Sequence, residues 1–294
     1  MEIKAKKSLG QNFLKDDAVL QRIIESANLS KSDVVIEIGP GQGVLTEKLA
    51  KVCKKVIAIE LDDRLIPILT EKFKNNGKIE IVHDDILKIN LVDLISNFQN
   101  PNSNKIIISN DTILKNNPDI NYKVIANLPY YITSSIIRLF LETKYPPQEM
   151  ILMVQKEVAE RICAQAGKMS ILAVSVQYYA KSEYLFTVPK ESFEPMPKVE
   201  SAVIKITRNN NQETKNKQEI KDFFKVVRVG FSAKRKTLIN NLSNGLSIDK
   251  KEIEEKLNTI VFSPPKTDQP RAGKNTRAQE LGVEDWRRLV KQII

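Results

Sequence analysis

The chain has 294 residues, 41% hydrophobic and 28% charged, and no apolar run approaches the roughly 18 residues that a membrane-spanning helix needs. The N-terminus is charged and lacks the apolar stretch of a secretory signal, so we expect a soluble cytoplasmic protein with one large and one smaller domain. A formal net charge of +10 favours a polyanionic partner, while two distant cysteines and a single histidine argue against a disulfide framework and a metal site.

Short apolar runs bounded by turn residues predict strands at residues 34–38, 56–60, 79–82, 124–127 and 150–154. Helix-like segments separate most of these runs, and strands that alternate with helices predict a parallel, doubly wound α/β sheet. EYLFTVP (183–189) and SAVIKITR (201–208) follow with only a proline-rich loop between them, which predicts an antiparallel edge to that sheet. An asparagine-rich insert at residues 96–122 is expected to be a surface excursion.

A polar stretch at residues 208–218 predicts a linker, and the pattern after it is helical to the C-terminus. The sequence therefore predicts two domains, residues 1–208 and residues 209–294, the second a small all-α domain. The charge supports this division, because residues 215–294 carry 18 Lys and Arg against 10 Asp and Glu, a net of +8, which leaves +2 for residues 1–214.

The basic residues of the second domain are concentrated in FFKVVRVGFSAKRKTLINNL (223–242). Cationic side chains are interleaved there with phenylalanines, a mixture that suits phosphate contacts beside apolar packing. The alternative is a solvated helical face without a partner. We expect phosphate contacts, and the candidate nucleic-acid-binding residues are Arg228, Lys234, Arg235 and Lys236.

A glycine loop, EIGPGQG, follows the first predicted strand. A dinucleotide fingerprint would place its third glycine at position 44, where this chain has Val44, so the match to G-x-G-x-x-G fails by one residue. Gly39 and Gly41 still allow a ligand to approach the backbone closely at the carboxyl end of a parallel strand, where open α/β sheets bind their ligands.

Acidic residues end the next two predicted strands. Glu60 is placed to accept hydrogen bonds from ribose hydroxyls, and Asp85, with Asp84 as the competing candidate, to accept one from an adenine amine. An acidic residue after a strand is often only a turn or a helix cap. Because these strand ends converge with the glycine loop, the sequence favours a nucleoside site.

The E-x-G-x-G-x-G loop and these two acidic strand ends look like an S-adenosylmethionine-dependent class I methyltransferase. Further motifs are GQNFL (10–14), NLPYYI (127–132), FEPMPKVESAV (193–203) and GFSAKRKTLINNL (230–242). Together they make the chain closely resemble, over nearly its whole length, the KsgA/RsmA family. The resemblance implies a class I methyltransferase sheet and dimethylation of the N6 amines of two adjacent adenosines in the 3′-terminal hairpin of 16S ribosomal RNA. The substrate would be the small ribosomal subunit or its precursor, and a role in subunit assembly is compatible with the resemblance.

The stretch NLPYY has a physical interpretation that fits this reaction. The exocyclic amine of adenine is a poor nucleophile, because its lone pair is delocalised into the ring. The amide oxygen of Asn127 and the backbone carbonyl of Leu128 can each accept one amine hydrogen and favour the pyramidal geometry that attack requires. Pro129 fixes the turn, and Tyr130 offers a face on which an extruded base can stack. The alternative is an ordinary turn with buried tyrosines.

The resemblance implies further site residues. Asn12 and Leu14 belong to the segment that lies over the methyl donor in this family, and Asn127 neighbours the donor as well. Phe193 is similar to the second residue that stacks on the target base. No metal is implied, and the implied cofactor is S-adenosylmethionine.

Other functions remain open from the sequence. The nearest enzymatic alternative is the related resistance methylase that modifies a large-subunit adenosine, and DNA and protein-amide methylases share the Asn-Pro type of turn. The C-terminal GFSAKRKTLINNL and the FEPMPKVESAV loop favour the small-subunit interpretation. A ribosome-assembly or transcription factor without turnover is the alternative from another class, and the intact EIGPGQG, Glu60 and Asn127 argue against it.

Overall fold

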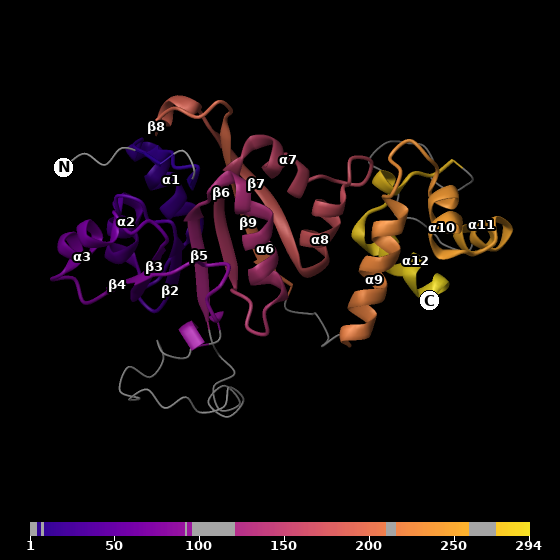
Figure 1. The fold of residues 1–294 in the computed structure, drawn as a ribbon, viewed down its shortest axis with the longest axis horizontal. Coiled ribbons are helices and arrows are strands. Elements are labelled where there is room, and N and C mark those ends of the chain that lie inside the picture. Colours follow the sequence, from indigo (N-terminus) through magenta and orange to yellow (C-terminus); the bar gives the residue numbers. More distant parts are fainter. Residues whose placement is uncertain (1–4, 7–8, 92, 96–120, 210–215, 259–274) are drawn as a thin grey trace. The chain divides into compact units, whose positions relative to one another are not determined.

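The computed structural model describes all residues except 1–4, 7–8, 92, 96–120, 210–215 and 259–274 (Figure 1). The chain forms two compact units. The first takes in residues 1–159 and 183–208, and the second takes in residues 160–182 and 209–294. The predicted functional division at residue 208 stays a prediction. In packing, residues 160–182 join the second unit, which the sequence did not indicate.

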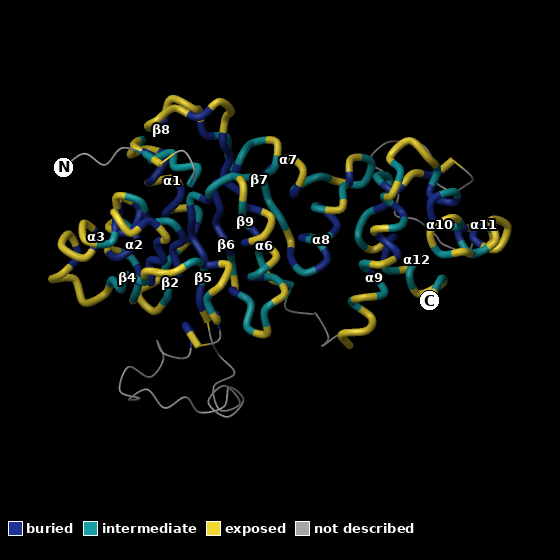
Figure 2. Tube along the Cα trace, in the orientation of Figure 1, coloured by how far each residue is buried: buried dark blue, intermediate teal, exposed yellow. Residues whose placement is uncertain are grey.

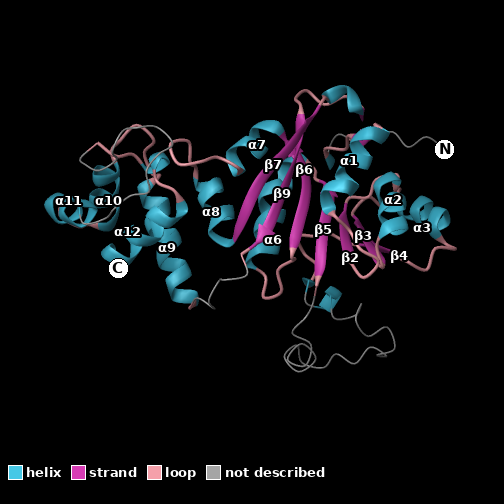
Figure 3. Cartoon of the chain, turned by 180° about the vertical axis from the view of Figure 1, so that it is seen from behind, coloured by secondary structure: helices cyan, strands magenta, loops and turns pink. Residues whose placement is uncertain are grey.

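The first unit is built on a sheet of the predicted class. Its strands are β2 (Val34–Ile38), β3 (Lys55–Glu60), β4 (Ile79–His83), β5 (Tyr122–Asn127), β6 (Glu149–Gln155), β7 (Ala180–Val188) and β9 (Ser201–Arg208). They lie side by side in the order β4-β3-β2-β5-β6-β9-β7 (Figure 3). The strands from β4 to β6 are parallel, and β9 runs antiparallel to β6. The mostly parallel α/β sheet with an antiparallel edge is therefore confirmed.

Strand identity follows from the apolar runs. The central strands are buried on both faces, so their β-branched and aliphatic residues form continuous runs rather than alternating with polar residues (Figure 2). The helices of this unit are α1 (Asp17–Ala27), α2 (Val44–Val52), α3 (Ile66–Phe73), α6 (Thr133–Glu142) and the start of α7 (Lys156–Ile162). Helix α1 contacts β6, α2 contacts β3 and α3 contacts β4.

The strand order determines where a ligand can bind. The chain builds β2, β3 and β4 in one direction and then returns to place β5 on the other side of β2. The order reverses between β2 and β5, and such a switch point opens a crevice at the carboxyl ends of the strands. The glycine loop follows β2 and the NLPYY stretch follows β5, so both lie at this crevice.

A second, very small sheet was not predicted. Strands β1 (Phe13–Leu14) and β8 (Phe193–Glu194) pair antiparallel, with Leu14 opposite Phe193. The short helix η3 (Lys190–Ser192) precedes β8, and the Ser192 hydroxyl donates to Asp16 at the N-cap of α1 over 2.9 Å. The N-terminal segment is thereby attached to the FEPMPKVESAV loop.

The second unit is helical, as predicted. It contains α8 (Ile171–Tyr179), α9 (Lys217–Gly230), α10 (Leu238–Leu246), α11 (Lys250–Asn258), η4 (Ala278–Glu280) and α12 (Val283–Ile293). Their apolar faces surround Trp286, and residues of α8 such as Val174 and Tyr178 belong to the same core, which explains why this segment joins the unit. Gly230 lies against Trp286, where an added Cβ would come within 2.3 Å of the indole ring. No helix in the described ranges is long and apolar enough to cross a membrane.

Of the predicted surface excursion at residues 96–122, only Asn121 and Tyr122 are described. Tyr122 begins β5, and it is buried with its hydroxyl donating to the carbonyl of Tyr145 over 2.8 Å. The predicted linker at residues 208–218 has described residues only at its two ends, where β9 finishes at Arg208 and α9 begins at Lys217.

Candidate functional site

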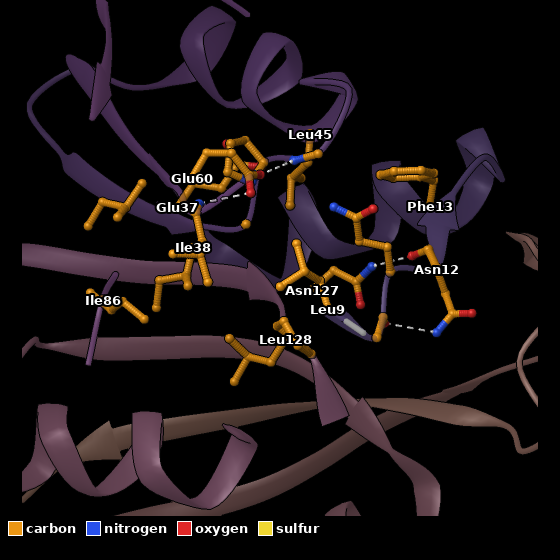
Figure 4. A pocket seen from close by; sticks show the side chains of 18 of the residues that line it. Leu9, Asn12, Phe13, Glu37, Ile38, Leu45, Glu60, Ile86, Asn127 and Leu128 are labelled. Carbon is orange, nitrogen blue, oxygen red and sulfur yellow. Dashed lines mark hydrogen bonds between the residues drawn. The ribbon is translucent and has the colours of Figure 1, made fainter. Parts of the chain in front are cut away.

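One pocket lies at the carboxyl ends of β2, β3, β4 and β5 (Figure 4). The predicted cofactor-binding residues all line it: Asn12, Leu14, Gly39, Gly41, Glu60, Asp85 and Asn127. The predicted residues Leu128, Pro129 and Tyr130 line it as well. Residues 9–14, called here the N-terminal segment, complete the wall. The strand ends that the sequence indicated therefore converge on one cavity, and the individual roles of these residues stay predictions.

The glycine loop is shaped by backbone angles that side chains resist. Gly39 has φ +65° and Gly41 has φ +59°, both in the left-handed region. The backbone N–H of Gly41 donates to the Glu60 carboxylate over 3.2 Å. A Cβ on Gly41 would approach the Phe13 ring to 3.1 Å, so the loop is packed between Glu60 and the N-terminal segment.

Glu60 is a buried and well-fixed carboxylate. It is 5% exposed and accepts hydrogen bonds from the backbone N–H groups of Gly41, Leu61 and Asp62, at 3.2, 2.9 and 2.8 Å. Burial raises the pKa of Glu60, and these backbone donors oppose the shift. The side chain is held in one orientation before any ligand binds, which suits recognition of a diol.

Glu37 is a pocket residue whose role sequence reasoning missed. It is 1% exposed, and within the described chain its Oε2 has no hydrogen-bond partner. Burial raises the pKa of Glu37 to about 8, and the negative charge of Glu60 acts in the same direction. A buried acceptor without a partner is costly, so this position fits a ligand group that donates hydrogen bonds or is cationic. The signal was present as the first letter of E-x-G-x-G-x-G.

The end of the third predicted strand (79–82) contributes two carboxylates to the pocket wall, Asp84 and Asp85. Asp85 is partly buried; its Oδ1 accepts from the backbone N–H of Leu87 over 3.0 Å, and its Oδ2 lies 3.3 Å from Lys88 Nζ. Asp84 is exposed and accepts from the backbone N–H of Asp85 over 2.7 Å. Because both line the pocket, the assignment of the adenine contact to Asp85 stays a prediction.

Asn127 is oriented by the N-terminal segment. Its Nδ2 donates to the backbone carbonyl of Asn12 over 3.2 Å, and Figure 4 shows the two residues facing each other. A carbonyl can only accept, so this contact assigns the amide nitrogen to Asn12 and leaves the amide oxygen to accept from another group. The next residue, Leu128, is fixed by its backbone N–H, which donates to the Met153 carbonyl over 3.1 Å.

The aromatic part of the stretch forms the short helix η2 (Tyr130–Ile132), which follows Pro129. The Tyr130 hydroxyl is 2.7 Å from the Ser201 hydroxyl, and burial raises the pKa of Tyr130, so its ring is anchored and neutral. Tyr131, to which the sequence gave no role, lines the same pocket and is 60% exposed.

Phe193 is placed differently from the other predicted residues. It is 2% exposed and packs with Leu14 and Val203 in the core rather than lining the pocket. Its position in β8 opposite Leu14 explains this burial, because the short β1–β8 pair turns both side chains inward. The stacking role that the resemblance implies for Phe193 stays a prediction.

The predicted basic residues Arg228, Lys234, Arg235 and Lys236 are all exposed, and they make no ion pair with any described residue. Arg228 lies on α9, and the other three lie in the loop between α9 and α10. Asn241 holds that loop, because its buried amide donates to the carbonyls of Gly230 and Ala233 over 2.6 and 3.1 Å.

The phenylalanines among these basic residues point inward. Phe223 is 3% exposed, and the Phe231 ring lies 5.5 Å from that of Trp286. The interleaving of aromatic and basic residues thus reflects helix α9 and the loop after it, in which the phenylalanines pack on the core and the cations are exposed. Elsewhere, no cluster of three or more His, Cys, Asp or Glu residues in the described chain could hold a metal ion.

Comparison with known proteins gives consistent matches. The family model for ribosomal RNA adenine dimethylase matches residues 2–263. The chain is 41% identical over 287 residues to ribosomal RNA small subunit methyltransferase A of Dehalococcoides mccartyi (strain CBDB1). The aligned region covers 98% of this chain and 88% of that protein. It is 40% identical over 293 residues to the protein of the same name from Fusobacterium nucleatum subsp. nucleatum, spanning 99% and 98%.

Solved structures agree with the fold. A dimethyladenosine transferase from Plasmodium falciparum has a TM-score of 0.70 and 26% identity, covering 96% of this chain and 98% of that one. The 23S rRNA methyltransferase ErmE has a TM-score of 0.69 and 24% identity, covering 96% and 99%, and that similarity establishes the fold alone.

Proposed function

Because the chain belongs to the ribosomal RNA adenine dimethylase family, we propose that it dimethylates the N6 amines of two adjacent adenosines in the 3′-terminal hairpin of 16S ribosomal RNA. The substrate is the small ribosomal subunit or its precursor, the enzyme works in the cytoplasm, and it contributes to subunit assembly. The observation that carries the proposal is the convergence of Glu60, Asp85 and Asn127 with the glycine loop on one pocket.

The pocket fits S-adenosylmethionine by the chemistry of its acceptors. The donor molecule offers an ammonium group, a ribose diol and an adenine amine, and all three donate hydrogen bonds. The carboxylates of Glu37, Glu60 and Asp85 are acceptors, and the first of these has an oxygen without a partner in the described chain. When bound, S-adenosylmethionine supplies an electrophilic methyl group on its sulfonium.

The target amine is shaped by Asn127 and Leu128. The amide oxygen of Asn127 and the carbonyl of Leu128 each accept one amine hydrogen, which draws the nitrogen lone pair out of the adenine ring and aims it at the methyl carbon. The contact of Asn127 with Asn12 supports this role, since it turns the amide oxygen away from the N-terminal segment. The transfer would break the methyl–sulfur bond and leave its electrons on the sulfur of S-adenosylhomocysteine, and the methylated nitrogen would release one proton to water, so no strong base is required.

The target base is held by stacking. The Tyr130 ring, fixed by its hydrogen bond to Ser201, offers a neutral face at the pocket, and base–aromatic stacking is worth about 1 to 3 kcal/mol. The cations Arg228, Lys234, Arg235 and Lys236 contact phosphates, which gives affinity without reading sequence.

Label mapping tests the proposal. Purified protein is incubated with methyl-labelled S-adenosylmethionine and either undermethylated small subunits or large-subunit RNA. We expect dimethylation of two adjacent adenosines in the 16S hairpin and none in the large-subunit RNA. Label on a large-subunit adenosine would contradict the proposal and support the resistance-type activity. Binding to the small subunit without any label would contradict it as well and support a non-catalytic assembly role.

A further inference from the structure

The N-terminal segment is attached to the pocket through a fixed glutamine. Gln11 Nε2 donates to the Asp62 carboxylate over 2.8 Å, and Gln11 Oε1 accepts from the backbone N–H of Lys6 over 2.7 Å. A backbone N–H can only donate, so the amide orientation follows from chemistry and the nitrogen must face Asp62. Gln11 itself lines the pocket.

Asp62 is a buried, charged anchor. Its side chain is fully buried, and the Arg64 Nε donates to Asp62 Oδ1 over 2.8 Å. The Arg64 guanidinium holds the pKa of Asp62 well below its usual range, and the amide of Gln11 contributes in the same direction. The carboxylate is therefore ionised at any working pH, and a hydrogen bond to an ionised acceptor is roughly twice as strong as a neutral one.

The same residue also holds Glu60. The backbone N–H of Asp62 donates to Glu60 Oε1 over 2.8 Å, so Asp62 contacts the ribose-site carboxylate through its backbone and the N-terminal segment through its side chain. Other contacts of the segment at the pocket are Asn12 with Asn127, Phe13 with Gly41 and Gly10 with Tyr131. Among these contacts, the one made by Gln11 has the ionised partner.

We propose that Asp62 is a positioning residue, which holds the N-terminal segment over the methyl donor through Gln11 while fixing Glu60 beneath it. This inference rests on the proposed function, because it takes the pocket to be the donor site. Removing the Gln11–Asp62 contact should let the bound donor escape faster, since the segment then opens more readily. The association rate of the donor and the affinity for RNA should change little.

The first test uses Gln11→Ala, which leaves the Asp62–Arg64 pair intact. Titration calorimetry and stopped-flow displacement with S-adenosylhomocysteine should show about tenfold weaker binding, mostly as a faster dissociation rate. Asp63→Asn is the control for the Asp62→Asn change used below, because it removes the same charge from an exposed neighbour, and it should bind as the wild type does. Unchanged dissociation from Gln11→Ala would overturn the inference.

The second test makes the contact sensitive to pH. Gln11→Glu places a second carboxyl against Asp62, near which the other charged groups are Arg64, Asp63 and Glu60. At about pH 5 the introduced carboxyl is protonated and can donate to Asp62; at about pH 8 it is ionised and repelled. The ratio of variant to wild-type affinity, which cancels the titration of Glu60, should fall roughly tenfold or more between these values.

A ratio of affinities that is the same at both pH values would contradict the positioning role, whether the variant binds the ligand as well as the wild type or more weakly. Failure of the proposed function looks different, because the wild type itself would then bind no S-adenosylhomocysteine. Additivity offers a further check: Gln11→Ala combined with Asp62→Asn should weaken binding less than the sum of the two single changes, since both remove the same contact.

Discussion

The two units of the molecule handle charge in opposite ways. In the first unit, the carboxylates of Glu37, Glu60 and Asp62 are buried, and Glu60 and Asp62 are held by several hydrogen bonds each. In the second unit, Arg228 and the Lys234–Lys236 loop are exposed and have no ion-pair partner in the described chain. The first arrangement is fixed before binding, whereas the second leaves its cations in water.

This difference indicates two kinds of recognition. Buried and oriented acceptors act over hydrogen-bond distances and are screened little by salt, so they suit a small ligand of defined shape. Exposed cations act through released counterions and depend steeply on salt, so they suit a phosphate backbone. Substitutions of the buried carboxylates or of Asn127 should therefore change donor binding or the chemical step, and substitutions in the basic loop should change RNA affinity alone.

The largest effect is expected from Asn127→Ala. If the amide oxygen accepts from the target amine, its loss matters most in the transition state, and the single-turnover methylation rate should fall about 100- to 1,000-fold. Substrate affinity should fall much less. The measurement is single-turnover methylation at saturating donor and RNA.

Donor affinity must be measured on the same variant, because Asn127 also contacts Asn12 of the N-terminal segment. Weaker donor binding that fully explains the lost rate would assign Asn127 to the donor and not to the amine. A near-normal rate at saturation would remove the acceptor role altogether and leave NLPYY as a turn.

Glu60→Ala should have the next largest effect. Loss of a charge-assisted acceptor weakens S-adenosylmethionine binding by about 1.5 to 3 kcal/mol, and RNA affinity should be largely unchanged. Because Glu60 also accepts from the backbone of Gly41, Leu61 and Asp62, the melting temperature of the free protein should fall too. Glu60→Gln, which keeps one acceptor oxygen, should lose less on both measures. Calorimetry that finds unchanged donor affinity for Glu60→Ala would exclude Glu60 from the site.

The sequence predicted the sheet well for a physical reason. Strands buried on both faces are continuous apolar runs, and the acidic or amide residue that ends such a run must lie at the carboxyl edge of a parallel sheet. The pair β1–β8 was missed, because strands such as Phe13–Leu14 are too short to show a period. The packing of residues 160–182 with the second unit was also missed, since it depends on contacts with distant Trp286.

Site residues followed the same rule. Glu60 and Asn127 were predicted to lie at the pocket because each one ends an apolar run, and Asp85 because it follows such a run within three residues. Gln11 and Asp62 have no such signal, and their contact joins positions far apart in the sequence. The burial of Phe193 was likewise invisible, because an aromatic residue beside prolines suits a core as well as a binding face.

Tyr130→Ala tests stacking. Loss of the ring should weaken capture of the target base by about 1 to 3 kcal/mol, and donor affinity should not change. Tyr130→Phe should be mild, because it keeps the ring and loses only the hydrogen bond to Ser201. Ser201→Ala removes the same hydrogen bond from the other side and serves as the matched control. RNA binding and single-turnover methylation rates are measured for the three variants with the same RNA. Equal impairment of Tyr130→Phe and Tyr130→Ala would refute stacking.

Glu37 gives a pH-dependent effect on stability. Its pKa in the folded protein, about 8, lies above the ordinary value of 4.5, so the folded state binds the proton more tightly than the unfolded state does. The stability of the free protein should therefore fall as pH rises from about 4.5 to about 8. Glu37→Gln removes this titration, so the melting temperature of the variant minus that of the wild type should increase as pH rises across the same range. Saturating donor should reduce the change of this difference with pH, since an ammonium beside Glu37 favours the ionised form. A difference in melting temperature that is independent of pH would contradict the burial argument.

The smallest effect at physiological salt should come from neutralising Arg235 and Lys236 together. If both contact phosphates, the slope of log affinity for RNA against log salt should decrease in magnitude by roughly two, and donor affinity should stay the same. The matched control neutralises Lys51 and Lys74 of the first unit. This double change removes the same charge from the protein, but the two lysines already form ion pairs with Glu47 and Glu71. Because long-range attraction depends on total charge while counterion release depends on contacts, only the first pair should change the slope. Equal slopes for both double variants would show that the basic loop acts through net charge, and the contrast between the two units would then lose its basis.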